Sequence, residues 1–253
     1  MTIRFYPPVR NRMFSMPRLC LALLFAALLN AQGTPARPKL TGLAHIALSA
    51  HDFAASRAYY RDFLGYEEFA TLPKADGSVG TAFIKINDRQ YIELSPENQP
   101  GTDRLKHIAL ETENAEAMRL YLKSKGVAVP DATPKGKSGN SNFMIKDPEG
   151  HQVEIVQYEP DGWSMRDKGK AMPATRISTH IRHMGLIVTK LEPMRKFYEE
   201  VLGFTETWRG SKDGKVLSWT NMKLPESDDI VKGVMLTRGG AVVHPSFQPA
   251  PAA

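Results

Sequence analysis

The chain has 253 residues, of which 42% are hydrophobic and 24% are charged, with 19 glycines, 18 prolines and one cysteine. This composition is typical of a globular protein and excludes a collagen, a coiled coil and a disulfide-stapled miniprotein. The formal net charge is +6, but residues 1–31 hold four arginines and no acid, so the rest of the chain carries 29 basic and 27 acidic residues. Without a basic patch in that remainder, we expect no nucleic-acid partner.

The first 31 residues have the order of a secretory signal. A basic stretch precedes an apolar run of 11 residues, 19–29, which is followed by Asn30 and Ala31. That run is too short for a transmembrane helix, which takes roughly 20 residues. We therefore expect a signal peptide, 1–31, cleaved near Ala31, and a mature protein that is exported, periplasmic or secreted, and outside the membrane. An uncleaved anchor is the alternative. The single cysteine, Cys20, lies in this segment, so the mature chain has no thiol for disulfides, catalysis or metal binding.

Three stretches of the remaining chain resemble one another. Two of them align without a gap from His45 and His183, and they share a tyrosine, a leucine, a glycine and a glutamate at matching positions. The third aligns from His107 and is one residue shorter before its glycine, Gly126. Internal repeats indicate that each copy is one supersecondary unit.

Each copy has the same sequence pattern of elements. A short apolar strand carries the histidine, and a helix with apolar residues at helical spacing follows. A glycine then stands where a helix ends in a left-handed residue. In the first copy three strands come next, which we place at 66–72, 79–86 and 90–95. The predicted unit is βαβββ.

The predicted fold class is α+β, built from tandem βαβββ modules. We expect the modules 41–97 and 105–158 to pair into one curved-sheet domain, 41–158. The remaining ranges are a polar linker, a third and incomplete module, and a disordered tail: 159–179, 180–238 and 239–253.

A histidine and a glutamate recur together in the first two copies. His45 precedes Glu93 by 48 residues, and His107 precedes Glu154 by 47. Taken singly, a strand histidine is usually packed, and a strand glutamate between apolar neighbours usually faces solvent. The recurrence favours a site instead. If the first and last strands of each copy are antiparallel neighbours, two imidazoles and two carboxylates meet on one face and can bind a divalent cation.

These repeats resemble the vicinal oxygen chelate superfamily, which includes glyoxalase I, fosfomycin- and bleomycin-resistance proteins and extradiol dioxygenases. The resemblance covers residues 41–238 and is carried by three motifs: HIAL at 45–48, FLGY at 63–66 and DPEGHQVE at 147–154. It implies that the paired modules hold a metal ion through four ligands: His45, Glu93, His107 and Glu154. It also implies that Glu93 and Glu154 are the catalytic residues, one of them loosening from the metal to carry a proton. The substrate-binding residues are unknown.

The third copy departs from this pattern. It has His183, but the residue 48 positions on is Val231, and no glutamate follows Glu226. We do not expect His183 to bind the metal. The copy could be structural, could pair with its equivalent in a homodimer, or could belong to a truncated frame. The other histidines have no counterpart between copies and are expected at the surface or in caps: His51, His151, His180 and His244. The turn 147–150 is expected to have no chemistry of its own.

The function that the pattern favours is a metal-dependent enzyme that chelates a small oxygenated substrate. Glyoxalase-like lyase or isomerase chemistry and dioxygenase chemistry both fit, as do Fe, Mn, Ni and Zn. Glyoxalase I itself uses a cytosolic thiol cofactor, which an exported protein would not meet. A ring-cleaving dioxygenase needs three protein ligands rather than four. The alternative is a non-catalytic small-molecule binder similar to the bleomycin-resistance proteins.

Overall fold

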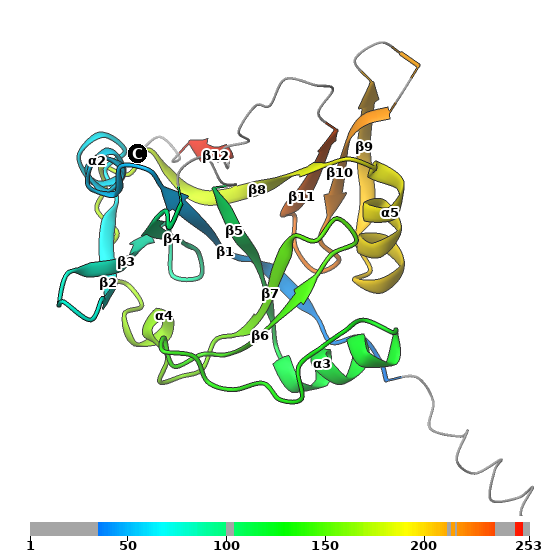
Figure 1. Cartoon of the computed structure of the whole chain (residues 1–253), viewed down its shortest axis with the longest axis horizontal. Coiled ribbons are helices and arrows are strands. Elements are labelled where there is room, and N and C mark those ends of the chain that lie inside the picture. Colours follow the sequence, from blue (N-terminus) through cyan, green and yellow to red (C-terminus); the bar gives the residue numbers. More distant parts are fainter. Residues whose placement is uncertain (1–34, 100–103, 212–213, 216, 236–245, 250–253) are drawn as a thin grey trace, which may run out of the picture. The chain divides into compact units, whose positions relative to one another are not determined.

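The computed structural model describes residues 35–99, 104–211, 214–215, 217–235 and 246–249 (Figure 1). The predicted signal peptide, 1–31, lies outside the described residues. The described part contains a seven-stranded sheet in the order β2-β3-β4-β1-β5-β7-β6 and a five-stranded sheet in the order β12-β8-β11-β10-β9. The α+β fold class is confirmed. Within the described residues, every helix is too short or too polar to cross a bilayer.

The first module has all the elements of the predicted βαβββ unit. They are β1 (Leu40–Ala50), α2 (Phe53–Ala58), the π-helical turn η1 (Tyr59–Phe63), β2 (Glu67–Pro73), β3 (Val79–Lys85) and β4 (Tyr91–Pro96). Asp52 caps the helix by accepting a hydrogen bond of 2.8 Å from the amide of Ala55. Gly65 follows the helical segment with a φ of +74°, the left-handed conformation that the sequence predicts there.

The second module has one strand fewer than predicted. Its elements are β5 (Leu105–Thr112), α3 (Ala115–Ser124), β6 (Ser141–Lys146) and β7 (Gln152–Gln157). Residues 125–140, which would hold the missing strand, contain Pro130 and Pro134 and make a single β-bridge, from Lys135 to Ser141. Proline has no amide hydrogen to donate to a strand ladder, so this stretch crosses to β6 as a loop.

The strand pairing inside each module is parallel, and the expected antiparallel arrangement is wrong. β1 pairs with β4 in parallel, and β5 pairs with β7 in parallel. The antiparallel contact is the one between modules, where β1 pairs with β5. The helix between the first strand and the later ones provides the crossover that a parallel pair needs. The two modules therefore share one continuous sheet.

The third module is complete in its elements, contrary to the expectation of a partial copy. It comprises β8 (Ser178–Val188), α5 (Leu191–Lys196), η2 (Phe197–Val201), β9 (Thr205–Ser211), β10 (Leu217–Lys223) and β11 (Ile230–Met235). The expected disordered tail is also wrong for residues 246–249, which form β12 (Ser246–Pro249), antiparallel to β8. β12 pairs with β8 along the same edge at which β5 pairs with β1 in the seven-stranded sheet. A second copy could pair at that edge only by displacing β12.

The segment 159–179 connects the second and third modules but is more than a linker. It forms the short helix α4 (Trp163–Arg166), and the backbone carbonyl of Asp167 accepts a hydrogen bond from the buried Lys85 ammonium. Farther along, Arg176 Nη1 donates to the carbonyl of Ile86 at 2.8 Å. These contacts fold the segment against the first module.

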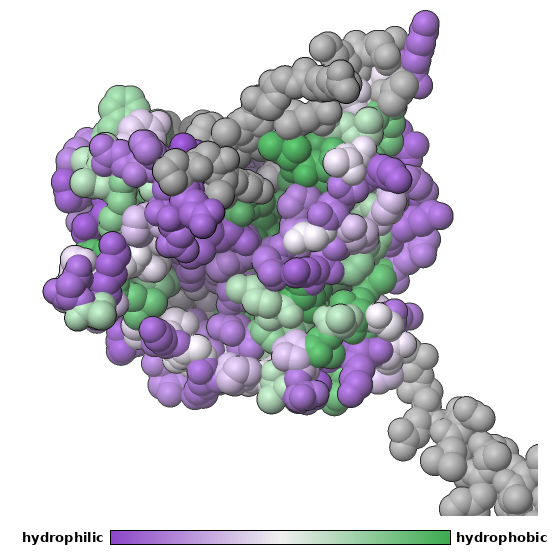
Figure 2. Space-filling model, viewed as in Figure 1, coloured by the Kyte–Doolittle hydropathy of each residue, from purple (hydrophilic) through white to green (hydrophobic). Residues whose placement is uncertain are grey.

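The helices α2, α3 and α5 lie with the hydrophobic core on one side of each sheet. α2 packs on β1 and β4, α3 on β6 and β7, and α5 on β10 and β11 (Figure 1). Ile92, Ile108 and Val153 point into this core and are essentially inaccessible to solvent. Hydrophilic residues predominate on the molecular face shown in Figure 2, with hydrophobic residues in smaller patches between them. Because side chains alternate along a strand, the neighbours of the core residues point to the opposite sheet face.

Candidate metal centre

The strand register places all four predicted ligands on that opposite face of the seven-stranded sheet, which we call the site face: His45, Glu93, His107 and Glu154. Ala47 of β1 lies directly across from the glutamate of β4 and the histidine of β5. Ala109 of β5 lies across from the histidine of β1 and the glutamate of β7. The two alanines have no side chain beyond Cβ, so the four longer side chains can converge above them.

Three of the four side chains bring one donor atom each to a common point. The Nε2 atoms of His45 and His107 are 3.0 Å apart, and Oε2 of Glu154 lies 3.2 Å from the first and 3.1 Å from the second. Two ligands at right angles, each about 2.1 Å from a metal ion, are separated by about 3.0 Å. The spacing therefore matches three adjacent positions of an octahedral site, and the donor set is that of a two-histidine, one-carboxylate triad.

Glu93 lies beside this group rather than in it. Its Oε1 is 3.5 Å from Nε2 of His45, and its Oε2 is 3.8 Å from Nε2 of His107. Its side chain is 22% exposed, against 7% for Glu154. The two glutamates are equivalent in the repeat but not in the structure, because Glu154 is enclosed and Glu93 stands at the open side of the site.

The charges of the site are strongly coupled. Burial opposes ionisation of Glu154, but the nearby imidazoles of His45 and His107 outweigh this effect and lower the pKa of Glu154 to about 2. Burial would likewise lower the pKa of His45, but the carboxylates of Glu93 and Glu154 outweigh it and the net shift is upward. Glu154 is therefore an anion across the physiological range, and it faces two imidazoles that can supply neutral nitrogen lone pairs.

The donor atoms fit a divalent cation better than they fit protons. A single hydrogen can bridge the two imidazole nitrogens, and two would repel each other, whereas a cation between them satisfies both lone pairs and the carboxylate together. Nδ1 of His45 is buried and has no hydrogen-bond partner among the described residues. The chemistry of this donor set is thus that of a metal site.

The His45 ring is held by stacking. The ring of Tyr91 lies parallel to it, with 4.5 Å between the centroids and 15° between the planes. Phe69 and Phe83 pack against Tyr91, and Trp163 of α4 packs edge-on against Phe83 at 5.3 Å. This aromatic cluster closes the first-module side of the site. The sequence analysis missed Tyr91, although its place two residues before Glu93 on one strand puts it on the same face.

Another edge of the site face is closed by an ion pair. Glu111, which is 4% exposed, accepts a hydrogen bond of 2.9 Å from Nε of Arg89. The hydroxyl of Tyr158 donates to the backbone carbonyl of Arg89 at 2.7 Å. With this edge and the aromatic cluster closed, Glu93 is the most exposed of the four predicted ligands.

Among the residues that the structure describes, the third module has no equivalent group of donor atoms. Ile230 pairs with His183 as Tyr91 pairs with His45, so Lys232 stands where the first module has Glu93. A count of 48 residues from His183 predicted Val231 at this position, but the third module has one more residue than the first module between its first and last strands. Burial and the charge of Lys232 lower the pKa of His183. The cationic side chain of Lys232 disfavours a metal ion beside His183.

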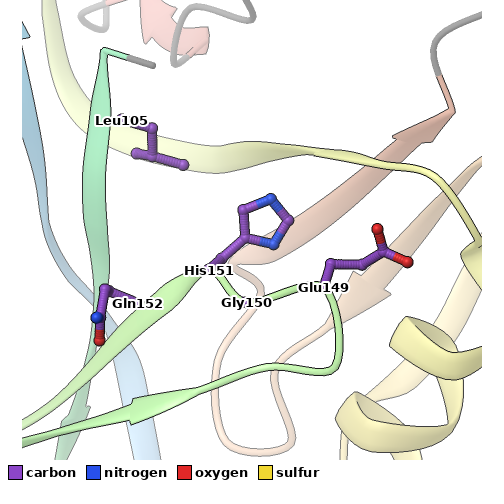
Figure 3. A pocket seen from close by; sticks show the side chains of 5 residues that line it. All are labelled: Leu105, Glu149, Gly150, His151 and Gln152. Carbon is purple, nitrogen blue, oxygen red and sulfur yellow. The ribbon is translucent and has the colours of Figure 1, made fainter. Parts of the chain in front are cut away.

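The turn 147–151 has a structural role that the sequence analysis missed. Glu149 accepts hydrogen bonds from the amide and hydroxyl of Thr189, both at 2.8 Å, and from the amide of Lys190. His151 lies between Asp147, at 2.8 Å, and the carbonyl of Ile187, at 2.9 Å. A small cavity of about 230 Å³ lies beside these side chains (Figure 3). The turn therefore fastens the second module to the start of α5.

The other histidines have ordinary structural contacts. His51 is exposed and contacts Glu97. His180 bonds to Oδ1 of Asp229 at 2.6 Å, and the other oxygen of that carboxylate accepts the amide of Leu43. His244 lies outside the described residues.

Comparison with known proteins agrees with this geometry. The family model of the Glyoxalase/Bleomycin resistance protein/Dioxygenase superfamily matches residues 42–155 and 180–249. The uncharacterized protein YaeR of Escherichia coli K12 is 25% identical over 120 residues, which are 45% of this chain and 93% of that protein. The iron-dependent extradiol dioxygenase of Rhodococcus jostii RHA1 is 29% identical over 143 residues, which are 50% of this chain and 47% of the dioxygenase. The chain thus spans about half the length of that enzyme.

Two solved structures share the fold at low sequence identity. The Mn(II)-bound glyoxalase from Novosphingobium aromaticivorans has a TM-score of 0.60 and 20% identity, covering 78% of this chain and 62% of its own. The 2,3-dioxygenase LapB from Pseudomonas sp. KL28 has a TM-score of 0.63 and 16% identity, covering 84% of this chain and 76% of its own.

Proposed function

The chain belongs to the Glyoxalase/Bleomycin resistance protein/Dioxygenase superfamily, and from that premise we propose that it is a metal-dependent enzyme acting on a small oxygenated molecule. His45, His107 and Glu154 hold a divalent cation. The observation that carries the proposal is the separation of 3.0–3.2 Å between their three donor atoms. When bound, such a cation acts as a Lewis acid that polarises substrate oxygens.

The carboxylate of Glu93 has the position of a proton carrier. It lies within 3.5–3.8 Å of both imidazoles, outside the group of three donors, and it is the most exposed of the four side chains. A substrate entering from that side meets Glu93 before the buried Glu154. There Glu93 would take a proton from a carbon of the substrate and return it to another, which is the proton transfer of lyase or isomerase chemistry.

Oxygen-dependent ring cleavage is the second candidate. Two histidines and one carboxylate, with three positions left open, form the set that non-haem iron oxygenases use. The likeness to the R. jostii dioxygenase supports this candidate. In that case Glu93 is a surplus carboxylate at the mouth of the site, and its replacement by glutamine leaves turnover within a few-fold.

The first test is the metal content of the purified protein. We expect about one divalent ion per chain, lost in the His107→Ala, Glu154→Ala double variant and retained in His183→Ala, the matched control from the third module. Turnover is then screened with Mn, Fe, Ni and Zn, and oxygen uptake distinguishes ring cleavage from proton transfer. A parent protein that takes up none of these metals on reconstitution would overturn the enzyme proposal in favour of a metal-free binder.

A further inference from the structure

The segment 159–171, which we call the α4 segment, connects strands near opposite ends of the seven-stranded sheet. The indole of Trp163 packs edge-on against Phe83 of β3, with 5.3 Å between the ring centroids. The amide of the same tryptophan donates a hydrogen bond of 2.9 Å to the carbonyl of Ser138, in the loop that leads to β6. In the sheet order, β3 and β6 are five strand spacings apart, which is roughly 24 Å in a flat sheet. One residue reaches both because the sheet curves, and Figure 1 shows α4 between the two ends.

The α4 segment lies against the site face, beside the open side of the metal centre. Phe83 pairs with Glu93 across β3 and β4. Residues that are directly opposite each other on neighbouring strands point to the same face of a sheet, so Phe83 lies on the site face. Trp163 therefore packs on the immediate neighbour of the outlying carboxylate, and any movement of this indole changes the width of the entrance there.

Polar contacts fasten the α4 segment to both modules. On the side of the second module, Oδ1 of Asn140 accepts the amide of Glu159 at 3.1 Å. On the side of the first module, the buried ammonium of Lys85 donates to the carbonyl of Asp167 and pairs with the carboxylate of Asp88 at 2.9 Å. That carboxylate also accepts the amide of Gly169 at 2.7 Å. We call the bonds of Lys85 and Asp88 to the α4 segment the first-module contacts.

The α4 segment has little apolar packing and a strained backbone. No apolar side chain between residues 159 and 177, all of which the structure describes, belongs to the hydrophobic core. Ala171 has a φ of +54°, a left-handed conformation that is unfavourable for a residue with a Cβ. Segments with few buried apolar contacts open at a lower free-energy cost than the core. Strain at Ala171 favours opening further if the residue relaxes when the segment leaves the sheet.

From these observations we infer that the α4 segment is a lid over the metal centre. The lid opens by breaking the first-module contacts, and its backbone turns near Ala171. Opening carries Trp163 away from Phe83 and widens the entrance beside Glu93, through which the substrate passes. The inference rests on the proposed function for what enters, whereas the opening itself requires neither metal nor turnover.

The test is hydrogen exchange of the full metal-free chain, followed by mass spectrometry on peptides from the lid and from β1 and β5. We expect the lid to exchange faster than these core strands. Lys85→Met should speed exchange of the lid about tenfold or more, as the loss of a hydrogen bond from a charged group predicts. Asp88→Ala, at a less buried position, should act in the same direction. Ala171→Gly removes the strain of the closed lid and should slow its exchange about fivefold.

The effect on the entrance is measured by the rate at which EDTA removes Ni from the loaded chain. Lys85→Met should raise this rate by about the same factor as it raises exchange of the lid, because both require the open lid. The matched control is Lys196→Met, which removes an exposed lysine from α5 of the third module and should change neither rate. A chain that binds no metal would refute the proposed function, and the exchange experiment would still determine whether the lid opens.

Two results would overturn the inference. If the lid of the parent exchanges as slowly as β1 and β5, or if neither Lys85→Met nor Asp88→Ala speeds its exchange, the α4 segment is a fixed wall of the site. If both variants speed exchange of the core strands as much as that of the lid, the first-module contacts stabilise the whole fold and hold no separate lid.

Discussion

Glu154 and Glu93 occupy equivalent positions in two repeats, yet their replacement by glutamine should have opposite effects. Glu154→Gln removes one of the three convergent donors and leaves two buried imidazoles without their anion. Changes in the surroundings of a metal ligand already cost 10–100-fold in affinity, so the loss of a ligand itself should weaken metal binding by more than ~100-fold. Glu93→Gln should keep the metal within about tenfold and, if Glu93 carries the proton, lose turnover.

Glu154→Gln should also lower the stability of the metal-free protein, by an amount that depends on pH. Glutamine resembles the protonated acid, so the comparison measures what ionisation of Glu154 contributes. Its pKa falls from 4.5 to about 2 on folding, which corresponds to about 3 kcal/mol at pH 7. A depressed pKa stabilises the fold above the unfolded value and loses its effect as pH falls towards 2, so about 2 kcal/mol should remain at pH 3.5.

Urea unfolding of the chelator-treated parent and variant at pH 7 and 3.5 measures this difference, and Glu93→Gln is the control. Metal affinity is read from competition with a chromophoric chelator. Equal stability of Glu154→Gln and parent at pH 7 would mean that the carboxylate is not paired with the imidazoles. If Glu93→Gln lost metal as completely as Glu154→Gln, the distinction between three donors and a fourth, outlying carboxylate would be wrong.

Three other expectations follow from single contacts. Metal affinity should rise with pH above 6.5, by up to tenfold per pH unit, because the raised pKa of His45 means that a proton must leave before the cation binds. A metal affinity that stays constant between about pH 6 and 8 would contradict this expectation. Tyr91→Ala should cost about 3–5 kcal/mol in thermal or urea unfolding and weaken metal binding, whereas Tyr91→Phe keeps the stacked ring and should bind metal normally. Glu149→Ala should destabilise by about 1–3 kcal/mol, because the bonds to Thr189 and Lys190 are lost, with metal content unchanged.

The convergence of His45, His107 and the two glutamates on one face could be predicted from sequence because the repeat carries the information. A histidine near the start of one strand and a glutamate on a later strand recur in two copies, and the pleat of a sheet brings alternate residues to one face. The alternation of side chains predicts that the histidine and the glutamate share a sheet face whether their strands are parallel or antiparallel. The sequence analysis assigned that direction wrongly. His45 and Glu93 meet because Ala47, two residues on, pairs with Glu93 in the parallel register.

Other features depend on contacts between distant segments, which spacing does not encode. The missing strand of the second module follows from its prolines, and that signal was present in the sequence. Nothing local indicates that Glu149 binds the residues just before helix α5 of the next module, because its partners lie 40 and 41 residues away. The position of Lys232 shows the limit of counting: one extra residue moves the equivalent of Glu93 from Val231 to its neighbour, and only the strand register resolves it.

The sequence repeat makes the histidine–glutamate pair of the first module equivalent to that of the second. The surroundings of the two glutamates then differ. Glu154 is enclosed beside two imidazoles, while Glu93 remains at the solvent side. Under the proposed function, Glu154 would help to hold the cation and Glu93 would move the proton. The third module repeats the same strands, and its register position for the carboxylate of Glu93 holds Lys232. Because a cationic side chain stands at that position, the third module lacks the outer carboxylate that Glu93 gives the first module.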